Sequence, residues 1–392
     1  MKHRFENFGG IVAVDDPPFL AFVDRNFMRE LGYAESPLWD NDDQRINVLS
    51  APTEVHFAVT NACNAGCPHC YMGSGESDRH ELDTSGFKRA LVKLQSIGVF
   101  HVALGGGEAL LRPDLFELAE FARNIGLVPN LTLSGHNVTE EIAKQLTVFG
   151  QVNLSIDGID QTRTVFRNPK MFEPADMVLT LLVEAGVKTG INCVMGRSNF
   201  EAIPQLFKYA RKKNVNEIEF LRLKPAGRGK ELYRSERTTY DQNIRLTPML
   251  AKYSKKYNVE AKVDCSFIPM LCYHKPPMDY LEKSATYGCE AGNVLIGAKS
   301  NGKINGCSFL PAIDLSVFDF HDQWHTNPYF INLRSWQDRA AEPCQSCPYL
   351  TICKGGCHAV ALHESGSLDA PDPDCPMVVN YYGKRDNHGG GI

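Results

Sequence analysis

The stretch Cys63-Asn-Ala-Gly-Cys67-Pro-His-Cys70 places three cysteines within eight residues, separated by three residues and then by two. A loop this short can turn all three thiolates toward one small centre. Structural zinc sites and ordinary iron–sulfur clusters take four protein ligands. An iron–sulfur cluster held by this loop alone would therefore keep one iron with a free coordination position. The rest of the chain can be examined for what surrounds that position.

The sequence around this loop alternates between strand-like and helix-like segments. Apolar, strand-like runs occur at 55–60, 101–104, 128–134, 152–157, 189–195 and 217–223. A helix-like segment follows each of them, at 84–94, 113–124, 139–147, 175–185, 201–213 and 248–257. Buried strands joined by crossover helices are typical of a parallel sheet. Six such units predict an α/β fold with a partial (β/α)6 TIM-like barrel, because a closed barrel of this kind needs eight.

Unusual polar residues and glycines follow these predicted strands directly. They are the cysteine loop, Gly106-Gly107-Glu108, Ser134, Asp157 and Lys224. Active sites of parallel barrels lie at the carboxyl ends of the strands. We therefore expect these residues to meet in one site.

The sequence outside this barrel divides into two further segments. In residues 1–51, the runs FGGIVAV and PPFLAFV flank Asp15-Asp16-Pro17-Pro18, which predicts a hairpin, and a short helix with Asp24 as its N-cap follows. Near residue 260 the alternation stops, and cysteines, glycines and prolines dominate up to Cys375. We expect three domains: an N-terminal hairpin and helix at 1–51, the barrel at 52–258, and a small cysteine-rich iron–sulfur domain at 259–392.

Cysteine usage and charge restrict the class of protein. The 392 residues include 13 cysteines, an odd number, and several of them form tight groups. Without a secretory signal, this pattern favours metal or cluster ligation in a reducing cytoplasm over disulfides. The net charge of −5 gives no reason to expect a nucleic acid or an anionic membrane as partner. Since no run of about 18 apolar residues occurs, we expect a cytoplasmic protein.

The C-x3-C-x2-C spacing directly after the first strand of such a series resembles the radical S-adenosylmethionine (radical SAM) superfamily. The resemblance implies that Cys63, Cys67 and Cys70 are the catalytic ligands of a [4Fe–4S] cluster. Its open iron would take the amine and carboxylate of SAM. One-electron cleavage of SAM would then give a 5′-deoxyadenosyl radical that abstracts hydrogen from the substrate. A zinc loop completed by a distant His or Cys is the alternative.

The resemblance also implies contacts with SAM next to this loop. The segment Gly106-Gly107-Glu108 matches the family's GGE segment, which holds the SAM amino group. Ser134 would meet the ribose or the carboxylate of SAM. His69 and Tyr71, on either side of Cys70, either pack on the adenine or form part of the barrel wall.

Further SAM contacts are expected on the fourth and fifth strands. Ser155 and Asp157 match the S-x-D-G pattern of the family. Arg167 lies where related enzymes carry an arginine for the SAM carboxylate, although Asn168 replaces the usual glycine and the pair sits about one residue late. A solvated surface arginine is the alternative for that position. Asn192 is a further candidate for the SAM pocket.

The cysteines of the third segment have regular spacings of their own. Two well-separated cysteines precede the run C-x2-C-x5-C-x3-C, and one more follows it. This pattern resembles the SPASM extension of radical SAM enzymes, which carries two auxiliary iron–sulfur clusters. The resemblance implies two sets of ligands: Cys344, Cys347, Cys353 and Cys375 for one cluster, and Cys289, Cys307 and Cys357 for the other.

The second of these sets is one ligand short. Either Cys265 or Cys272 completes it, or one iron is open to substrate or another ligand, and we expect the open iron. Structural zinc is the alternative for the whole domain. Cys193 lies in a predicted buried strand, so we expect it to belong to the core.

Auxiliary clusters suit reactions whose product is more oxidised than the substrate. The segment GVFHVALGGGEALLRPDLFEL (98–118) resembles peptide (RiPP) maturases of the mycofactocin and pyrroloquinoline quinone type. This resemblance implies a radical SAM oxidoreductase that modifies a ribosomally made precursor peptide by cross-linking, decarboxylation or backbone excision. It also implies an external one-electron donor of the flavodoxin or ferredoxin type. Ser308, where sulfatase maturases carry a catalytic Asp, disfavours that branch.

Two other functions remain open. One is a radical SAM dehydrogenase or epimerase that acts on a small molecule. The other is an iron–sulfur electron carrier without catalysis, which Glu108 and Ser134 disfavour because a carrier needs no SAM pocket. The hairpin of residues 1–51 either offers an edge strand to a leader peptide or caps the open barrel.

Overall fold

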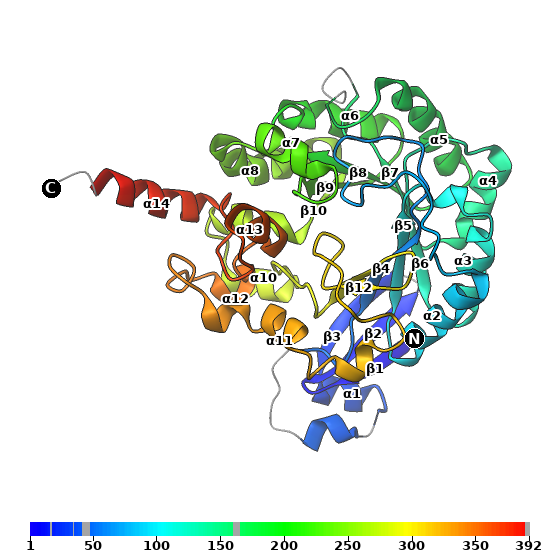
Figure 1. Ribbon diagram of the computed structural model, residues 1–392, viewed down its shortest axis with the longest axis horizontal. Coiled ribbons are helices and arrows are strands. Elements are labelled where there is room, and N and C mark those ends of the chain that lie inside the picture. Colours follow the sequence, from blue (N-terminus) through cyan, green and yellow to red (C-terminus); the bar gives the residue numbers. More distant parts are fainter. Residues whose placement is uncertain (16–17, 34, 41–47, 160–164, 389–392) are drawn as a thin grey trace.

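A curved sheet with helices on its outer side organises the chain, as Figure 1 shows for the computed structural model. The structure describes residues 1–15, 18–33, 35–40, 48–159 and 165–388. Seven strands pair in parallel in the order of the sequence: β4 (Glu54–Thr60), β5 (His101–Gly106), β6 (Val128–Leu133), β7 (Val152–Ser155), β8 (Thr189–Met195), β9 (Glu217–Arg222) and β10 (Glu260–Val263). The predicted α/β fold with a parallel sheet is confirmed.

Helices connect these strands and cover the outer face of the sheet. They are α2 (Thr84–Ser96), α3 (Leu115–Asn124), α4 (Glu140–Gln145), α5 (Phe172–Glu184), α6 (Ile203–Lys212), α7 (Gly229–Glu236) and α8 (Tyr240–Tyr257). Each predicted strand is followed by its helix. Among the described residues, none of the helices is long and apolar enough to span a membrane.

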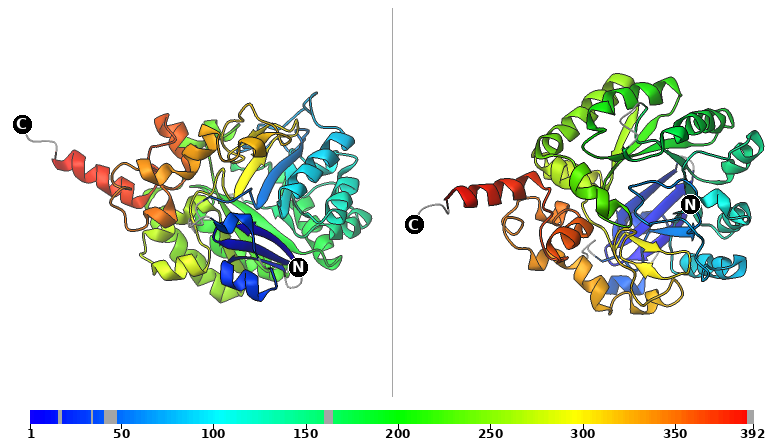
Figure 2. Two further views of the ribbon diagram at one scale, coloured as in Figure 1. Left: turned by 90° about the horizontal axis from the view of Figure 1, so that it is seen from below. Right: turned by 45° about the horizontal axis from the view of Figure 1, so that its top comes forward.

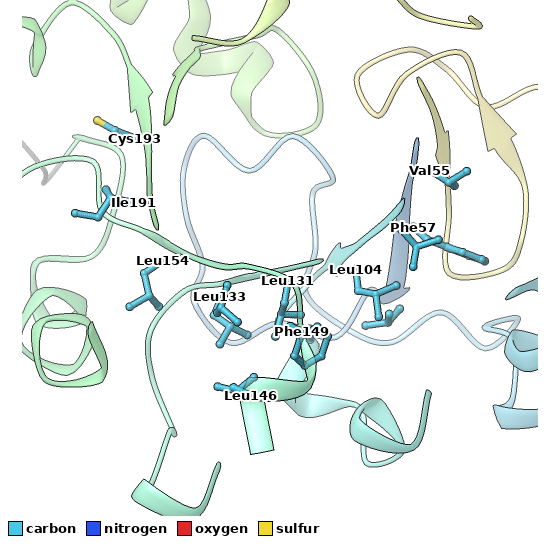
Figure 3. Close-up of a cluster of buried hydrophobic side chains, with 14 of the residues drawn as sticks. Val55, Phe57, Leu104, Leu131, Leu133, Leu146, Phe149, Leu154, Ile191 and Cys193 are labelled. Carbon is cyan, nitrogen blue, oxygen red and sulfur yellow. The ribbon is translucent and has the colours of Figure 1, made fainter. Parts of the chain in front are cut away.

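Apolar side chains fill the space between the strands and the helices. Figure 3 shows Phe57, Leu104, Leu131 and Leu154 projecting from neighbouring strands into this layer. The ring of Phe57 lies 4.3 Å from that of Phe87 on α2. Burial of each such side chain contributes about 1.5–3 kcal/mol to folding. The core therefore fixes the strands, and with them the polar residues at the strand ends.

Helix α8 corrects one predicted boundary. The sequence pattern suggested a helix from Pro248 to Tyr257, but α8 begins at Tyr240 and contains Pro248 in its interior. A capping box starts the helix: the N–H of Gln242 donates to Thr239 Oγ1 at 3.2 Å, and the Gln242 side chain accepts the Thr239 N–H at 3.0 Å. Such a cap satisfies free N–H groups of the first turn, so it marks the helix start more strongly than the proline does.

The sheet also gains strands from beyond residue 258. Strand β10 pairs in parallel with β9, and β11 (Leu295–Ala298) pairs in parallel with β4. A short strand, β12 (Ile304–Asn305), continues the sheet in the antiparallel sense. The expectation that the alternation stops near residue 260 is therefore wrong. These strands span two to four residues, which is too short to produce a recognisable apolar pattern.

A second, three-stranded antiparallel sheet forms the N-terminus: β1 (Lys2–Glu6), β2 (Gly9–Asp15) and β3 (Pro18–Asp24). The predicted hairpin is the β2–β3 pair, and its turn residues 16–17 lie outside the described residues. Strand β1 was not predicted. Helix α1 (Arg25–Glu30) follows with Asp24 as its N-cap, as expected. Figure 2 shows this small sheet against the barrel.

Arg4 of β1 joins the small sheet to the barrel. Its guanidinium donates to the carbonyl oxygens of Ala51 at 2.7 Å, Pro52 at 2.9 Å and Gly98 at 2.9 Å. Arg4 is 8% exposed and also pairs with Glu6 at 2.7 Å. Because a buried charge is costly unless fully bonded, these contacts fix the position of the small sheet.

The C-terminal segment folds into short helices and loops beside the barrel: α9 (Ile268–Cys272), α10 (Met278–Lys283), α11 (Pro328–Arg334), α12 (Leu350–Cys353), α13 (His358–Ser365) and α14 (Pro376–His388). Figure 1 shows α14 projecting away from the body. Arg222 of β9 anchors the segment, since its guanidinium donates to both oxygens of Asp372 at 2.6 and 2.9 Å and to Asp374 at 2.8 Å.

Candidate active site

The three-cysteine loop begins where β4 ends, at the carboxyl edge of the parallel sheet. The Cys63 N–H donates to the carbonyl of Gly75 at 2.7 Å, which closes the loop at its base. Arg228, just before α7, donates from Nε to the carbonyl of Cys67 at 3.0 Å and from Nη1 to that of Ser74 at 2.8 Å. The role of Arg228 was not visible in the sequence, because it lies about 160 residues from the loop.

Burial and neighbouring charges both affect the pKa values of the thiols in this loop. Burial raises the pKa of Cys63 and of Cys67. At Cys67 the guanidinium of Arg167 opposes that rise, and its Nη1 lies 3.5 Å from the Cys67 sulfur. Thiolates are the form that binds metal. A cation beside the thiol therefore suits a site where the thiolate is used.

The end of β5 packs directly on the backbone of the cysteine loop. Gly107 donates its N–H to the carbonyl of Thr60, and Glu108 donates its N–H to that of Ala62, both at 2.8 Å. A Cβ atom at Gly107 would clash with the carbonyl group of Ala62. Gly106 has a φ of 115°, which L-residues rarely adopt. Glycines are required here because two backbone segments meet.

Glu108 places a carboxylate beside this junction. Its side chain is 2% exposed, and Oε2 accepts the backbone N–H of Ser134 at 3.1 Å as well as the Ser134 hydroxyl. Within the described part of the chain, Oε1 has no hydrogen-bond partner. A buried carboxylate oxygen without a donor costs free energy. An ammonium group, such as that of SAM, would supply the missing donor, so this residue fits the cofactor.

A chain of polar contacts runs from Glu108 back to the cysteine loop. The hydroxyl of Ser134 lies 2.6 Å from Nδ1 of His136, and Nε2 of His136 lies 2.6 Å from Oδ1 of Asn64. Asn64 follows Cys63 in the loop. The sequence did not indicate this role for either residue, because His136 belongs to no recognisable motif and Asn64 occupies a variable position of the C-x3-C-x2-C loop. Their contacts connect the end of β6 to the loop.

Asp157 and Arg167 form a buried ion pair next to Cys67. Arg167 donates from Nε to Asp157 Oδ2 at 2.5 Å, and the Val194 N–H donates to Oδ1 at 2.7 Å. The side chains are 0% and 14% exposed. The alternative of a solvated surface arginine at 167 is therefore wrong. His69 adds a further contact, with Nε2 at 3.7 Å from Asp157.

Ser155 and Asn192 lie side by side in the register of β7 and β8. The Asn192 side chain accepts a hydrogen bond from Asn153 at 2.8 Å. Both residues are partly buried. Ser155 precedes Asp157 by two residues, so this pair lies on the strands just before the buried Asp157–Arg167 pair.

A cavity of about 700 Å³ opens beside the cysteine loop. Tyr71 and Met72 of the loop line one wall, and Ser308, Phe309 and Leu310, which follow Cys307, line another. The ring centroids of Tyr71 and Phe309 are 4.9 Å apart, and burial raises the pKa of Tyr71 to about 12. Two cysteine-bearing segments far apart in the sequence thus enclose one space.

Charged side chains lie under this cavity. His56 lines it, with Nε2 at 3.1 Å from Glu54 and Nδ1 at 3.5 Å from the Ser308 hydroxyl. Burial and the charge of Asp264 raise the pKa of Glu219 to about 7. Lys224 donates to Asp264 and lies 4.3 Å from the ring centroid of Phe309. The inside of the barrel is therefore polar below the cavity.

The cysteines of the C-terminal segment gather in two places. Cys344, Cys347, Cys353 and Cys375 line one small cavity. Cys289 and Cys307 pack against a cluster of buried residues that includes Cys357. These are the two sets expected from the sequence. Among the residues that the structure describes, no three His, Cys, Asp or Glu side chains are arranged to hold a single metal ion. Sets composed of thiols alone fit iron–sulfur clusters, whose usual ligands are cysteine thiolates.

Comparison with known proteins identifies relatives that match more than four fifths of the chain. A sequence model described as the radical SAM superfamily matches residues 57–210. Mycofactocin maturase MftC of Mycobacterium tuberculosis is 30% identical, over 83% of this chain and 83% of its own length. AdoMet-dependent heme synthase of Methanosarcina barkeri is 28% identical, over 84% and 98%. PqqA peptide cyclase of Methylorubrum extorquens is 26% identical, over 87% and 89%.

A solved structure shares the fold over nearly the whole chain. Streptococcus suis SuiB, crystallised with its precursor peptide SuiA, superposes with a TM-score of 0.74. The match covers 95% of this chain and 98% of SuiB, at 18% sequence identity. At that identity the likeness concerns the fold alone. It includes the parallel barrel and the cysteine-rich segment that follows it.

Proposed function

The chain belongs to the radical SAM superfamily, and on that premise we propose that it is a SPASM-type maturase that modifies a ribosomally synthesised precursor peptide. When bound, the cluster at Cys63, Cys67 and Cys70 and its SAM supply a 5′-deoxyadenosyl radical for hydrogen abstraction. One observation carries the proposal. The cavity beside the cysteine loop is lined both by Tyr71 and Met72 and by the residues that follow Cys307, so a substrate in it contacts both cysteine-bearing segments.

Residues of this chain account for the binding of SAM next to the loop. Glu108 accepts the amino group through its unpartnered oxygen. Ser134 is held at the same carboxylate and is placed for the ribose or the SAM carboxylate. Arg167, held by Asp157, brings the positive charge that the SAM carboxylate needs. Ser155 and Asn192 complete the pocket from β7 and β8.

The C-terminal cysteines would hold two auxiliary clusters, which would supply an acceptor for the electron that the substrate loses after hydrogen abstraction. The set at Cys289, Cys307 and Cys357 adjoins the cavity through Ser308 and Phe309, so it is the set nearer to the substrate. An external one-electron donor of the flavodoxin or ferredoxin type reduces the enzyme. Removing an electron from the substrate into an adjacent cluster fits a product that is more oxidised than the substrate.

The small N-terminal sheet supports a peptide as the substrate. Strand β3 is an outer strand and pairs only with β2 in the described residues. From Phe19 to Asp24 its residues are exposed or half-buried, and Phe19 is 50% exposed. An exposed edge strand can bind an extended peptide by β-augmentation. We propose that the leader part of the precursor binds along β3 while the modified part enters the cavity.

A small-molecule substrate is the second candidate. It is favoured by the 28% identity to the AdoMet-dependent heme synthase, which is close to the 30% found for the mycofactocin maturase. The cavity volume of about 700 Å³ also lies within the range of small-molecule sites, about 300–1,000 Å³. A porphyrin would then occupy the space proposed for the peptide.

Mass spectrometry separates the two candidates. The reconstituted, reduced protein is incubated anaerobically with SAM and either a short peptide encoded beside its gene or an iron porphyrin. We expect a mass change in the peptide, together with peptide-dependent formation of 5′-deoxyadenosine. The C67A variant, which lacks one thiol of the loop, is the control and should leave the peptide unchanged. A changed porphyrin with an unchanged peptide would overturn the proposal in favour of the second candidate.

A further inference from the structure

Cys265 stands at the carboxyl edge of the barrel sheet, directly after β10. The Asp264 N–H donates to the carbonyl of Phe220 at 3.1 Å, which extends the pairing of β10 with β9 by one residue. Asp264 then caps the short helix η7 (Cys265–Phe267) by accepting the Ser266 N–H at 3.0 Å. The chain therefore turns at Asp264, and Cys265 lies at the same edge as the other site residues.

One buried ion pair ties the segment of Cys265 to that of Cys357. The guanidinium of Arg222 donates to the carbonyl of Ser266 at 3.1 Å and to Asp372 at 2.6 and 2.9 Å. Oδ2 of Asp372 also accepts the N–H of Cys357 at 2.9 Å. Arg222 is 3% exposed and Asp372 is 0% exposed. Two cysteine segments almost one hundred residues apart are thus fixed on the same guanidinium–carboxylate pair.

A second cation lies among the same cysteines. Lys224, 6% exposed, donates to Asp264 and stands over the ring of Phe309, two residues after Cys307. Lys224 therefore connects the segment of Cys265, through the adjacent Asp264, with the segment of Cys307, through Phe309.

Cys289, the remaining member of the set, packs with Cys307 against the buried cluster that includes Cys357. Cys265, Cys289 and Cys307 are only partly buried, whereas Cys193 and Cys272 are buried. The segment of Cys265 thus lies beside three cysteines that already pack together, and Cys265 itself is not closed off in the core.

The other two unassigned cysteines lie elsewhere. Cys272 is 0% exposed and packs with Ile352 and Cys353, beside the other set of four thiols. Cys193 is 2% exposed in the core of the barrel, as Figure 3 shows. Of the two cysteines that the sequence left open for the incomplete set, Cys265 is therefore the one beside it.

We infer that Cys265 is the fourth protein ligand of the auxiliary cluster held by Cys289, Cys307 and Cys357, an inference that rests on the proposed function. This cluster is then fully held by cysteines and leaves no iron open to substrate. The substrate binds in the cavity next to the cluster rather than on it, and the auxiliary cluster acts by electron transfer. This reverses the open iron expected from the sequence.

Iron analysis and electron paramagnetic resonance (EPR) of cysteine variants test this inference. The full chain is reconstituted anaerobically as wild type, C265A and C272A. Wild type should bind about twelve irons per chain, as three cubes would require. C265A should lose up to about four of them or, if the cluster survives on three thiols, show an altered EPR signal for one auxiliary cluster. C272A, which removes the other cysteine that the sequence left open for this set, should keep the EPR signal of the cluster at Cys289, Cys307 and Cys357.

The outcomes distinguish this inference from the proposed function. If wild type binds about twelve irons while C265A matches it in iron content and EPR signals, Cys265 is not a ligand and only the inference fails. If wild type takes up zinc and no iron, the proposed function fails as well. Should C265A not fold, as judged by circular dichroism, C265S keeps the size and polarity of the side chain. The same two measurements on C265S then decide the question.

Discussion

Oε2 of Glu108 accepts the backbone N–H of Ser134 at 3.1 Å, while Oε1 of the same buried carboxylate has no partner in the described part of the chain. The carboxylate is thus fixed in orientation by the end of β6 and still has one free oxygen. The backbone of the same residue is fixed as well, because the Glu108 N–H donates to the carbonyl of Ala62 at the junction of β5 and the cysteine loop. A positioned carboxylate oxygen is therefore available for the ammonium group that the proposed SAM contact requires.

Replacing Glu108 by Gln should weaken the binding of SAM. A hydrogen bond between charged groups contributes about 1.5–3 kcal/mol, so the loss corresponds to about 10- to 100-fold in affinity. Equilibrium dialysis with labelled SAM on the reconstituted protein measures it. The control is Glu117→Gln on the surface of α3, where the side chain is 56% exposed. Equal affinity of E108Q and wild type would show that Glu108 does not hold the amino group.

Gly107→Ala should displace the cysteine loop, because the new Cβ would clash with the carbonyl of Ala62. We expect a loss of about four irons per chain, the content of one cube, and loss of SAM cleavage. Gly105→Ala is a matched control two residues away, since a Cβ there meets nothing within 4 Å. If both variants keep their iron and their activity, close packing of β5 on the loop is not needed for the site.

Arg167→Ala should destabilise the protein by about 3–5 kcal/mol, because it leaves the buried Asp157 carboxylate unpaired. Adding Asp157→Asn should recover part of that loss, since the unpaired charge then disappears. Urea unfolding of wild type, both single variants and the double variant measures the coupling. The exposed Arg89 on α2 provides a control substitution. Strictly additive effects of R167A and D157N would contradict the pairing.

Glu219 should make stability depend on pH. Its pKa is raised from 4.5 to about 7 by burial and by Asp264, so the folded state binds more protons than the unfolded state in that range. Stability should therefore fall as the pH rises from about 4.5 to 7. Glu219→Gln should remove this pH dependence. The part of the free energy of unfolding that depends on pH should be on the order of 1 kcal/mol, because the Glu219 side chain is only partly buried.

Thermal unfolding of wild type and E219Q between pH 5 and pH 8 checks this. The melting temperature of E219Q relative to wild type should rise with pH. A difference that stays constant over the range would mean that Glu219 titrates as it does in the unfolded chain.

Phe19→Asp should weaken the binding of the leader peptide, because it places a charge on the exposed edge strand β3. Phe27→Asp on α1 is the matched control, since the two rings are 50% and 46% exposed. Fluorescence anisotropy with a labelled leader peptide measures affinity. We expect a loss of about tenfold or more for F19D, equivalent to about 1.4 kcal/mol, and no loss for F27D. Equal losses would mean that the peptide does not bind along β3.

The sequence revealed those parts of the site that depend on local pattern. Residues directly after parallel strands meet at one edge of the sheet, so Cys63, Glu108, Ser134 and Asp157 could be placed together without a structure. The large apolar strands made that prediction possible, because their burial fixes the register. The two groups of C-terminal cysteines could be anticipated for a similar reason, since their spacings follow a known pattern.

Contacts between distant segments could not be read in this way. Strand β11 pairs with β4 across about 240 residues, and its four residues carry no pattern of their own. Arg228, which follows β9, and His136, which follows β6, both contact the cysteine loop. Neither belongs to a sequence motif. The place of Cys265 depends on β10, which the apolar pattern did not indicate. Each of these contacts arises from the tertiary fold.

Reductive cleavage of SAM is the most direct test of the proposed radical SAM chemistry. The full chain and a variant with Cys63, Cys67 and Cys70 all replaced by Ala are reconstituted anaerobically, reduced and mixed with SAM, and 5′-deoxyadenosine is measured by liquid chromatography. We expect 5′-deoxyadenosine from wild type and none from the variant, which should still show the absorbance of its auxiliary clusters. A wild-type protein that binds zinc in place of iron and leaves SAM intact would contradict it.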